Sequence, residues 1–392
     1  MNANERLVVA VLRERGDLDR AAVAAAVGLP KTTVAGVVGR LLRDGVLAER
    51  AGTGRGRRGR RAGELTLASA DRVGVIALSH GLVRAAVAAA DGTILARRDA
   101  GLAGVRDERQ ILDLGLNRLA EAAAAAGEQP DRVVVGVPAP FERGAGTLYG
   151  PAPEPLRDGD LGDLLGGLHA DPSGPVGERL GRPATAENDA NLATLGEAVF
   201  GAGRGLRDFV YVKIVEGIGA GLFLGGALHR GARGLAGELG HVQVTDDGPW
   251  CRCGGRGCLI HVIRGSAHSY VADAYGKPVD FRAVLGLASA GESGTRRILA
   301  DAGRRVGRVL ADTATMLGPE AIVVDGALGA ATEPFLAGVR EMLDRHTAPV
   351  VARTVRLIGG GLGDNAEILG GVALARLEST VNQLLREDYR TR

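Results

Sequence analysis

The sequence predicts an α/β protein with a winged helix-turn-helix over residues 1–67 and a two-lobed body over residues 68–392. Two patterns predict this organisation. Short apolar helices and a basic hairpin fill the first part, whereas apolar strands alternate with alanine-rich helices from about residue 70 onward. At about 320 residues, the second part exceeds the usual size of one domain, so we expect two lobes.

Composition excludes several classes of protein. No apolar run approaches the roughly 20 residues that a membrane span needs. The opening segment MNANERLVV lacks the basic and apolar stretches of a signal peptide. Three cysteines, an odd number, exclude a disulfide framework and suit a reducing compartment. We therefore expect a cytoplasmic protein that does not associate with a membrane.

The net charge of +2 hides a difference between the two parts of the chain. Residues 1–67 hold 13 of the 48 Lys and Arg and 7 of the 46 Asp and Glu, a net charge of +6. The remaining 35 basic and 39 acidic residues give the body a net charge of −4. This asymmetry indicates that the N-terminal part binds nucleic acid.

Three helices are expected in the N-terminal part. Apolar residues at helical spacing before Gly16 predict the first, and Asp19 is placed to cap a second that Gly28 ends. A third begins near Pro30, and the face opposite its apolar stripe carries donors and small residues that suit a DNA major groove. These residues are Lys31, Thr32, Thr33, Gly36, Arg40 and Arg43. The alternative is the solvated face of an ordinary three-helix bundle.

Two short strands, 46–50 and 64–67, enclose a basic segment and predict the wing. Its arginines suit phosphates or a narrow minor groove. They are Arg55, Arg57, Arg58, Arg60 and Arg61. Residues 54–59 also match the pattern G-x-G-x-x-G, but no βαβ unit frames them and no acidic residue follows at the ribose position. We therefore reject a dinucleotide-binding loop here.

The body alternates predicted strands and helices. Strands are expected over 73–78, 83–89, 93–97, 133–137, 209–215, 221–224, 321–324 and 354–357. Helices are expected over 111–126, 189–200, 262–274, 295–317 and 367–385. We expect the first lobe to comprise residues 68–187 and the C-terminal helix over 365–392, and the second lobe to comprise residues 188–364.

All three cysteines, Cys251, Cys253 and Cys258, lie within eight residues and follow His241. Together these four residues supply three thiolates and one imidazole, the ligand set of a closed structural zinc site. Four protein ligands leave no open position for a catalytic zinc. The alternative is three free buried thiols, which the clustering of the only cysteines disfavours.

Two further stretches carry groups suited to a small ligand. Residues 187–191, Glu-Asn-Asp-Ala-Asn, precede a helix, and Asp189 could serve there as a general base. By itself this motif is equally a helix N-cap. The glycine-rich turn over 216–221 brings backbone N–H groups near an anion. Glu238 stands three residues before His241, so a bound metal would fix the loop that carries it.

These stretches, in this order and behind a winged helix, resemble the ROK family of repressors, open reading frames and sugar kinases. The segments that carry the resemblance are ENDANLATLGEAVFG, the glycine turn, RGARGLAGELGHV and CRCGGRGC. The resemblance implies an actin-like, ribonuclease H-like fold with a zinc-bearing loop beside a sugar pocket. It also implies the repressor branch of the family, which carries an N-terminal winged helix that the kinase branch lacks.

The resemblance assigns roles to individual residues. Asn188 and Glu238 match sugar contacts, Asp189 matches the catalytic aspartate of the kinases, and His241 matches a histidine that touches both sugar and zinc. The three cysteines match the zinc thiolates. We therefore expect an effector site formed by Asn188, Asp189, Glu238 and His241.

Three departures oppose kinase activity or alter the pocket. Ala77 stands where the kinases have the aspartate of their first phosphate loop, and Leu78 adds bulk beside it. Glu216 replaces a threonine and would face a polyphosphate with a negative charge. Ile260 replaces a sugar-contacting glutamate, which removes one hydroxyl partner from that wall.

We therefore expect a DNA-binding transcriptional regulator, usually a repressor, and not an enzyme. Its degenerate kinase body would sense a sugar or sugar derivative and form a homodimer or homotetramer. Its expected partners are operator DNA and the effector, and its expected cofactor is structural zinc. One alternative is an active ATP-dependent sugar kinase with a fused DNA-binding domain. The other is a regulator that binds no small ligand.

Overall fold

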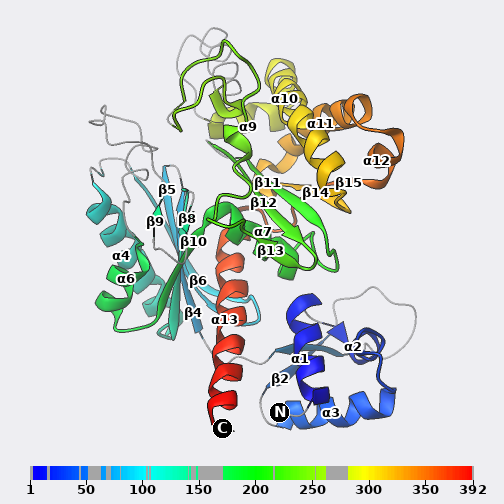
Figure 1. Cartoon of the computed structure of the whole chain (residues 1–392). Coiled ribbons are helices and arrows are strands. Elements are labelled where there is room, and N and C mark those ends of the chain that lie inside the picture. The colour runs from blue at the N-terminus through cyan, green and yellow to red at the C-terminus, as the bar shows by residue number, and fades with distance from the viewer. Residues whose placement is uncertain are drawn as a thin grey trace.

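A computed structural model gives the fold of the chain. It describes residues 3–15, 18–43, 46–51, 63–67, 72–79, 81–102, 105, 107–139, 141–142, 147–148, 171–214, 217–251, 253–261 and 281–390. The expected helix over 262–274 and the wing arginines at 55–61 lie outside these residues. Figure 1 shows the N-terminal unit beside a larger body, with the last helix running between them and along the body.

The N-terminal unit, residues 3–67, combines three helices with a small sheet. Its elements are α1 (Ala3–Arg15), β1 (Leu18–Asp19), α2 (Arg20–Val27), α3 (Lys31–Arg43), β2 (Leu47–Ala51) and β3 (Gly63–Leu67), and the sheet order is β1-β3-β2. Asp19 caps α2 by accepting the Ala22 N–H at 2.7 Å, and Gly28 ends it in the left-handed conformation. Both signals act as the sequence predicts. The short strand β1 was not predicted.

The first sheet of the body has the order β10-β7-β4-β5-β6. Its strands are β4 (Arg72–Ser79), β5 (Leu82–Ala89), β6 (Ile94–Gly101), β7 (Arg132–Val137) and β10 (Ala184–Asn188). β4, β5 and β6 are antiparallel, whereas β7 and β10 join in parallel. Helices α4 (Glu108–Ala126) and α6 (Ser173–Leu180) pack against this sheet through one apolar cluster. β8 (Phe141–Glu142) and β9 (Thr147–Leu148) form a separate hairpin.

The second sheet has the order β13-β12-β11-β14-β15. Its strands are β11 (Phe209–Ile214), β12 (Ile218–Leu224), β13 (Ala227–His229), β14 (Ala321–Val324) and β15 (Arg356–Gly359). The long helices α10 (Ser293–Leu317) and α11 (Thr332–His346) cover its outer face. The remaining described helices here are α9 (Phe281–Ser289), α12 (Pro349–Thr354) and the 3-10 turns η1 (Leu239–His241), η2 (Gly326–Ala331) and η3 (Gly363–Asn365).

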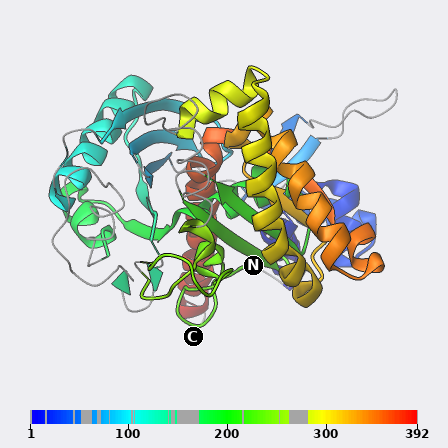
Figure 2. The same cartoon turned by 90° about the horizontal axis from the view of Figure 1, so that it is seen from above.

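Two helices lie between the two sheets, α7 (Asp189–Phe200) and α13 (Ala366–Arg390). One apolar cluster joins them to both sheets, through Val75 and Val134 on one side and Phe209 and Val323 on the other. Figure 2 shows α13 in the centre of the molecule, with one half of the body on each side. The body therefore consists of two α/β halves, each built on one sheet, with α7 and α13 packed between them.

Most predicted elements match the structure, although several boundaries differ. The strand predicted over 93–97 runs from Ile94 to Gly101, and the strand predicted over 221–224 begins at Ile218, so Gly219 and Gly221 lie in β12 and not in a turn. The predicted helix over 189–200 and strand over 321–324 coincide with α7 and β14. The strand predicted over 354–357 is wrong at its start, because Thr354 ends α12 and the strand begins at Arg356. A proline in the first turn makes a short helix of 349–354, which an isolated apolar run does not reveal. β10, β13, α6, α9 and α11 were not predicted.

Within the described residues, no single helix is long and apolar enough to cross a membrane. Taken together, α2 and α3 meet the length and composition needed, but their axes bend by 114° at the break. Both helices contribute buried residues to the core of the N-terminal unit.

Candidate functional site

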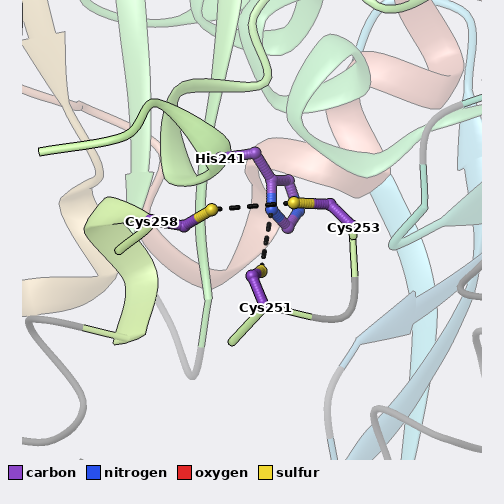
Figure 3. Close-up of side chains that lie close together, drawn as sticks. All are labelled: His241, Cys251, Cys253 and Cys258. Carbon is purple, nitrogen blue, oxygen red and sulfur yellow. Dashed lines mark hydrogen bonds between the residues drawn. The ribbon is translucent and has the colours of Figure 1, made fainter. Parts of the chain in front are cut away.

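Four potential metal ligands come together in the loop that follows β13. The Nδ1 or Nε2 atom of His241 and the Sγ atoms of Cys251, Cys253 and Cys258 all lie within 4.8 Å of one another. Cys251 Sγ is 3.4 Å from His241 Nδ1, and the Sγ atoms of Cys253 and Cys258 are 3.6 Å apart (Figure 3). Zinc bonds of about 2.0–2.3 Å give a tetrahedron with edges of about 3.5–3.8 Å. The four side chains fit such an ion.

The backbone of this loop shapes the cluster. The Cys251 N–H donates to the Gly255 carbonyl at 2.8 Å, and an isolated bridge pairs Gln243 with Cys258. Gly257 has a φ of +65°, and a Cβ there would lie 1.8 Å from the Thr245 carbonyl oxygen. A side chain at 257 is therefore excluded by both conformation and space. The glycines between the cysteines allow the chain to close around an ion.

The electrostatics of the cluster suit a neutral imidazole. Burial, with a smaller effect from nearby His261, lowers the pKa of His241 below its ordinary value. A neutral imidazole is the form that ligates metals. The direction of this shift favours the imidazole form that a metal site needs.

Asn188 and Asp189 lie at the junction of β10 and α7. Asn188 caps the helix by accepting the Asn191 N–H at 3.0 Å, and its amide donates to the Ala139 carbonyl at 3.1 Å. One oxygen of Asp189 accepts the Ala190 N–H at 2.7 Å, and its other oxygen pairs with Lys213. Asn188 therefore caps the helix, and Asp189 has a second, buried partner; the ligand-binding role expected of the two residues stays a prediction.

An ion cluster surrounds Asp189, and the sequence analysis did not single out its other members. Lys213, on β11, pairs with Asp189 and with Glu367, the second residue of α13. Ser79, at the end of β4, donates to Glu367 at 3.3 Å. Burial opposes the charge of Lys213, but Asp189 and Glu367 outweigh it and raise its pKa above the ordinary value. A lysine inside the apolar strand FVYVKI is the sequence signal that predicts such a buried pair.

Two further ion pairs, Arg84 with Asp364 and Arg230 with Glu187, flank this cluster. Arg84 on β5 is buried and donates to Asp364 at 3.0 Å and to Ser79 at 3.4 Å. Glu187, fully buried, accepts from Arg230 at 2.7 Å and from Asn191 at 3.0 Å. These contacts join strands of the first sheet to residues of the second half. Asp189 therefore lies within a network that spans both halves of the body.

Glu238 stands directly before η1, the turn that carries His241. Burial, and then the charge of Asp189, raise the pKa of Glu238 to about 7. The two carboxyl groups therefore lie close enough to interact. The Ala220 N–H donates to the Gly237 carbonyl at 2.9 Å, which holds this segment against β12. The fold thus brings Asp189 close to Glu238, which stands three residues before His241. The effector site itself stays a prediction.

The face of α3 predicted for DNA contact is mostly exposed. Lys31, Thr32, Gly36 and Arg40 are exposed and Thr33 is half-buried, whereas the apolar stripe of the helix is in the core. Arg40 also donates to Glu5 of α1 at 2.9 Å. That pair gives Arg40 a structural role within the N-terminal unit.

Two of the three departures from the kinase pattern lie within the described residues. Ala77 and Leu78 are fully buried in β4. Ile260 is half-buried next to the cysteine loop, whereas Glu216 lies outside the described part of the chain. Neither described position supplies a carboxylate.

The fold and the site define a class of protein. Its members have an α/β body of two halves, a His/Cys cluster, and an Asn-Asp pair where a helix begins. The sequence matches the ROK family over residues 76–378, so the chain belongs to that family. The expected ROK, actin-like fold of the body is thereby confirmed, with Asp189 and the cluster inside the matched range.

Two relatives and one solved structure illustrate the range of the family. The bifunctional enzyme NanE/NanK of Brucella melitensis is 40% identical over 208 residues, which cover 52% of this chain and 38% of the relative. The chain thus spans well under half the length of that protein. The xylose repressor of Caldicellulosiruptor bescii is 24% identical over 390 residues, covering 95% and 94% of the two chains.

A solved structure has the same fold over nearly the whole chain. It is a ROK family transcriptional regulator, a homologue of the E. coli Mlc protein, with a TM-score of 0.69 and 20% identity. The match covers 95% of this chain and 96% of that one. The similarity therefore includes the N-terminal unit as well as the body.

Proposed function

We propose that this chain is a DNA-binding transcriptional regulator of the ROK family and acts as a repressor. The observation that carries the proposal is an N-terminal unit with an exposed polar α3 face, joined to a complete ROK body. The similarity to a xylose repressor over 95% of the chain supports it. Operator DNA is the proposed partner, in a homodimer or homotetramer with two recognition helices at fixed spacing.

The proposed domain division follows from this function. Residues 1–67 form the winged helix-turn-helix, in which α3 enters the major groove and Arg55, Arg57, Arg58, Arg60 and Arg61 contact phosphates. Residues 68–187 with 365–392 form the first lobe, and residues 188–364 form the second. The separation of the two five-stranded sheets supports this division of the body.

The body is proposed to sense a sugar or sugar derivative at Asn188, Asp189, Glu238 and His241 without phosphorylating it. Lys213 neutralises the Asp189 carboxylate, which opposes its use as a general base. Ala77 leaves the first phosphate loop without a metal-binding carboxylate. The body therefore binds a hydroxyl-rich ligand and lacks the groups that position a phosphoryl donor.

The metal proposed for the His241 cluster is a structural zinc ion. The donor set of three sulfurs and one nitrogen, and the spacing of those atoms, suit zinc. When bound, the ion supplies a rigid cross-link and not reactivity, because four protein ligands fill its coordination sphere. His241 and the cysteines would then hold the segment that carries Glu238 beside Asp189.

The decisive experiment measures binding of genomic DNA fragments to the full chain and sequences those retained. A small set of shared sites is expected, and monosaccharides such as xylose and glucose are then titrated against the bound sites. Exchange of Arg57 and Arg58 for Ala should weaken binding to all sequences and reduce the salt slope by about 2. Arg305→Ala with Arg308→Ala, at two exposed positions of α10, is the matched control. Equal loss in both double variants, or no retained sites, contradicts the proposal.

An active sugar kinase is the second candidate, favoured by the 40% identity to NanE/NanK over half of this chain. A coupled assay for ADP release with hexoses and N-acetylhexosamines separates the two. Sugar-dependent turnover that Asp189→Asn abolishes would establish the kinase. A regulator without any small ligand, which Ile260 favours, predicts that no sugar changes either DNA binding or thermal stability.

A further inference from the structure

The helix pair α7 and α13 connects the ion cluster with the N-terminal unit. Asp189 is the first residue of α7, and Glu367 is the second residue of α13. Lys213 pairs with both carboxylates, so one ammonium group joins the starts of two helices. All three side chains are buried, with exposed fractions of 8% for Asp189, 5% for Glu367 and 3% for Lys213.

The two helices also touch directly, backbone against backbone. A Cβ on Gly370 would lie 1.7 Å from the Leu192 carbonyl oxygen, and one on Gly196 would lie 2.3 Å from that of Ala366. Such close approach leaves no layer of side chains to absorb a displacement. A shift at the start of α7 is therefore transmitted to α13.

The C-terminal end of α7 and the middle of α13 meet the N-terminal unit. Arg376 of α13 donates to the Thr66 hydroxyl of β3 at 3.0 Å, and both residues are buried. The same guanidinium lies 5.7 Å from the ring centre of Phe200, the last residue of α7. Just beyond α7, Arg204 pairs with Glu64 of β3 at 3.7 Å. Strand β3 thus contacts the far end of α7 and the middle of α13, the same two helices that Lys213 joins.

The contact between the N-terminal unit and the body includes a cavity. It has a volume of about 550 Å³ and lies between α1 and the body, lined by Ala10, Leu195, Val199, Phe223, Leu228 and Leu377 among others. A space of this size leaves room for α1 to shift relative to α7. The N-terminal unit can therefore change its position on the body about its contacts through β3.

We propose that Lys213 is a positioning residue. Through α7 and α13 it couples the Asp189 site to the contacts that hold the N-terminal unit on the body. The proposal rests on the proposed sensor role of that site. A ligand hydroxyl that donates to Oδ2 of Asp189 shares the negative charge of that oxygen with the Lys213 ammonium group and so weakens the Lys213 bridge. A weaker Lys213 bridge lets α7 shift against α13, and the shift reaches Phe200, Arg376 and β3.

Hydrogen exchange of the full chain tests this coupling without DNA or ligand. Lys213→Met should speed amide exchange in β3 (63–67) roughly tenfold more than in α11, within the usual range of coupling between sites. The exchange rate of α11, on the outer face of the second sheet, reports the overall loss of stability that removal of the buried cation causes. Arg308→Met, on the exposed face of α10, is the matched control and should alter neither segment. Exchange that is unchanged in β3, or uniformly faster throughout, overturns the proposal.

A second variant tests the coupling from its other end and serves also if Lys213→Met fails to fold. Thr66→Val keeps the shape of the side chain and removes the acceptor of Arg376. Because coupling between sites is reciprocal, exchange at the start of α7 (189–195) should rise while α11 stays unchanged. Faster exchange confined to β3 contradicts the proposal. Neither measurement requires DNA or sugar, so its outcome is independent of the proposed function.

Discussion

Lys213 forms a buried ion pair with Asp189, the residue that matches the catalytic aspartate of the family's kinases. A carboxylate that already binds an ammonium group accepts a substrate proton less readily. The same pair places a positive charge where the two halves of the body meet, and Glu367 of α13 completes it. This arrangement supports our proposal of a ligand-binding site in place of a catalytic one.

Removing the charge of Lys213 should destabilise the body. Lys213→Met leaves Asp189 without its ammonium partner and Glu367 with only Arg84, 3.9 Å away, among the described cations, and breaking a buried pair costs about 3–5 kcal/mol. Urea denaturation at pH 7 measures the loss. The control is Arg308→Met, whose exposed pair with Asp312 should contribute under about 1 kcal/mol. Similar losses in both variants would contradict the role of Lys213.

Metal analysis should find about one zinc ion per chain, as expected of a closed site with four protein ligands. His241→Gln should lose the ion and lower the melting temperature, because a structural zinc adds its binding free energy to folding. His261→Gln is the matched control, since His261 lies near His241 but is not among the four clustered ligands. Zinc retained by the His241 variant, or lost equally by both, would refute the proposed ligand set.

The free energy of unfolding should fall as the pH rises towards 7. Burial, followed by the charge of Asp189, raises the pKa of Glu238 from 4.5 to about 7. Between these values the unfolded chain has released a proton that the folded chain still holds. The folded state therefore binds more protons, and each pH unit in this window costs on the order of 1 kcal/mol.

Denaturation at a series of pH values from 4 to 8 measures the contribution of Glu238. Glu238→Gln removes the titrating group and should flatten the curve across this window. Glu333→Gln, on exposed α11, is the control and should leave the slope as in the wild type. A slope that persists in the Glu238 variant would show that another group is responsible.

The crossing of α7 and α13 should not tolerate a side chain. Gly370→Ala would drive a methyl group to 1.7 Å from the Leu192 carbonyl oxygen, so the helices must separate. Such overpacking should cost at least about 2 kcal/mol. Gly286→Ala is the matched control, because a Cβ there meets nothing within 4 Å and alanine favours the helix. Chemical denaturation compares the two, and equal stability would contradict the close packing.

The sequence analysis worked where a feature depends on neighbours along the chain. The bounds of α7 were predicted because a polar cap precedes a continuous run of helix-forming residues. The end of α2 at Gly28 was predicted because glycine readily takes the left-handed conformation that ends a helix. The strand start at 354 was wrong because the same short apolar run suits a helix turn or a strand.

The glycines depend instead on residues that are distant along the chain. The count of 62 has no explanation in the sequence beyond the wing, one turn and the cysteine loop. In the structure, Gly370 lets α13 touch α7, and Gly303 and Gly338 let α10 touch α11. These requirements come from backbone atoms of segments distant in sequence, so no local pattern announces them.

By itself the sequence determined the family and the four residues of the metal cluster, because rare residue types at short spacing carry their chemistry with them. Only the tertiary structure decided the partner of Asp189. Lys213 follows it by 24 residues, and Glu367 lies another 154 residues beyond Lys213. Buried charges must be paired, but which of many charges meet is decided by how the sheets and helices assemble.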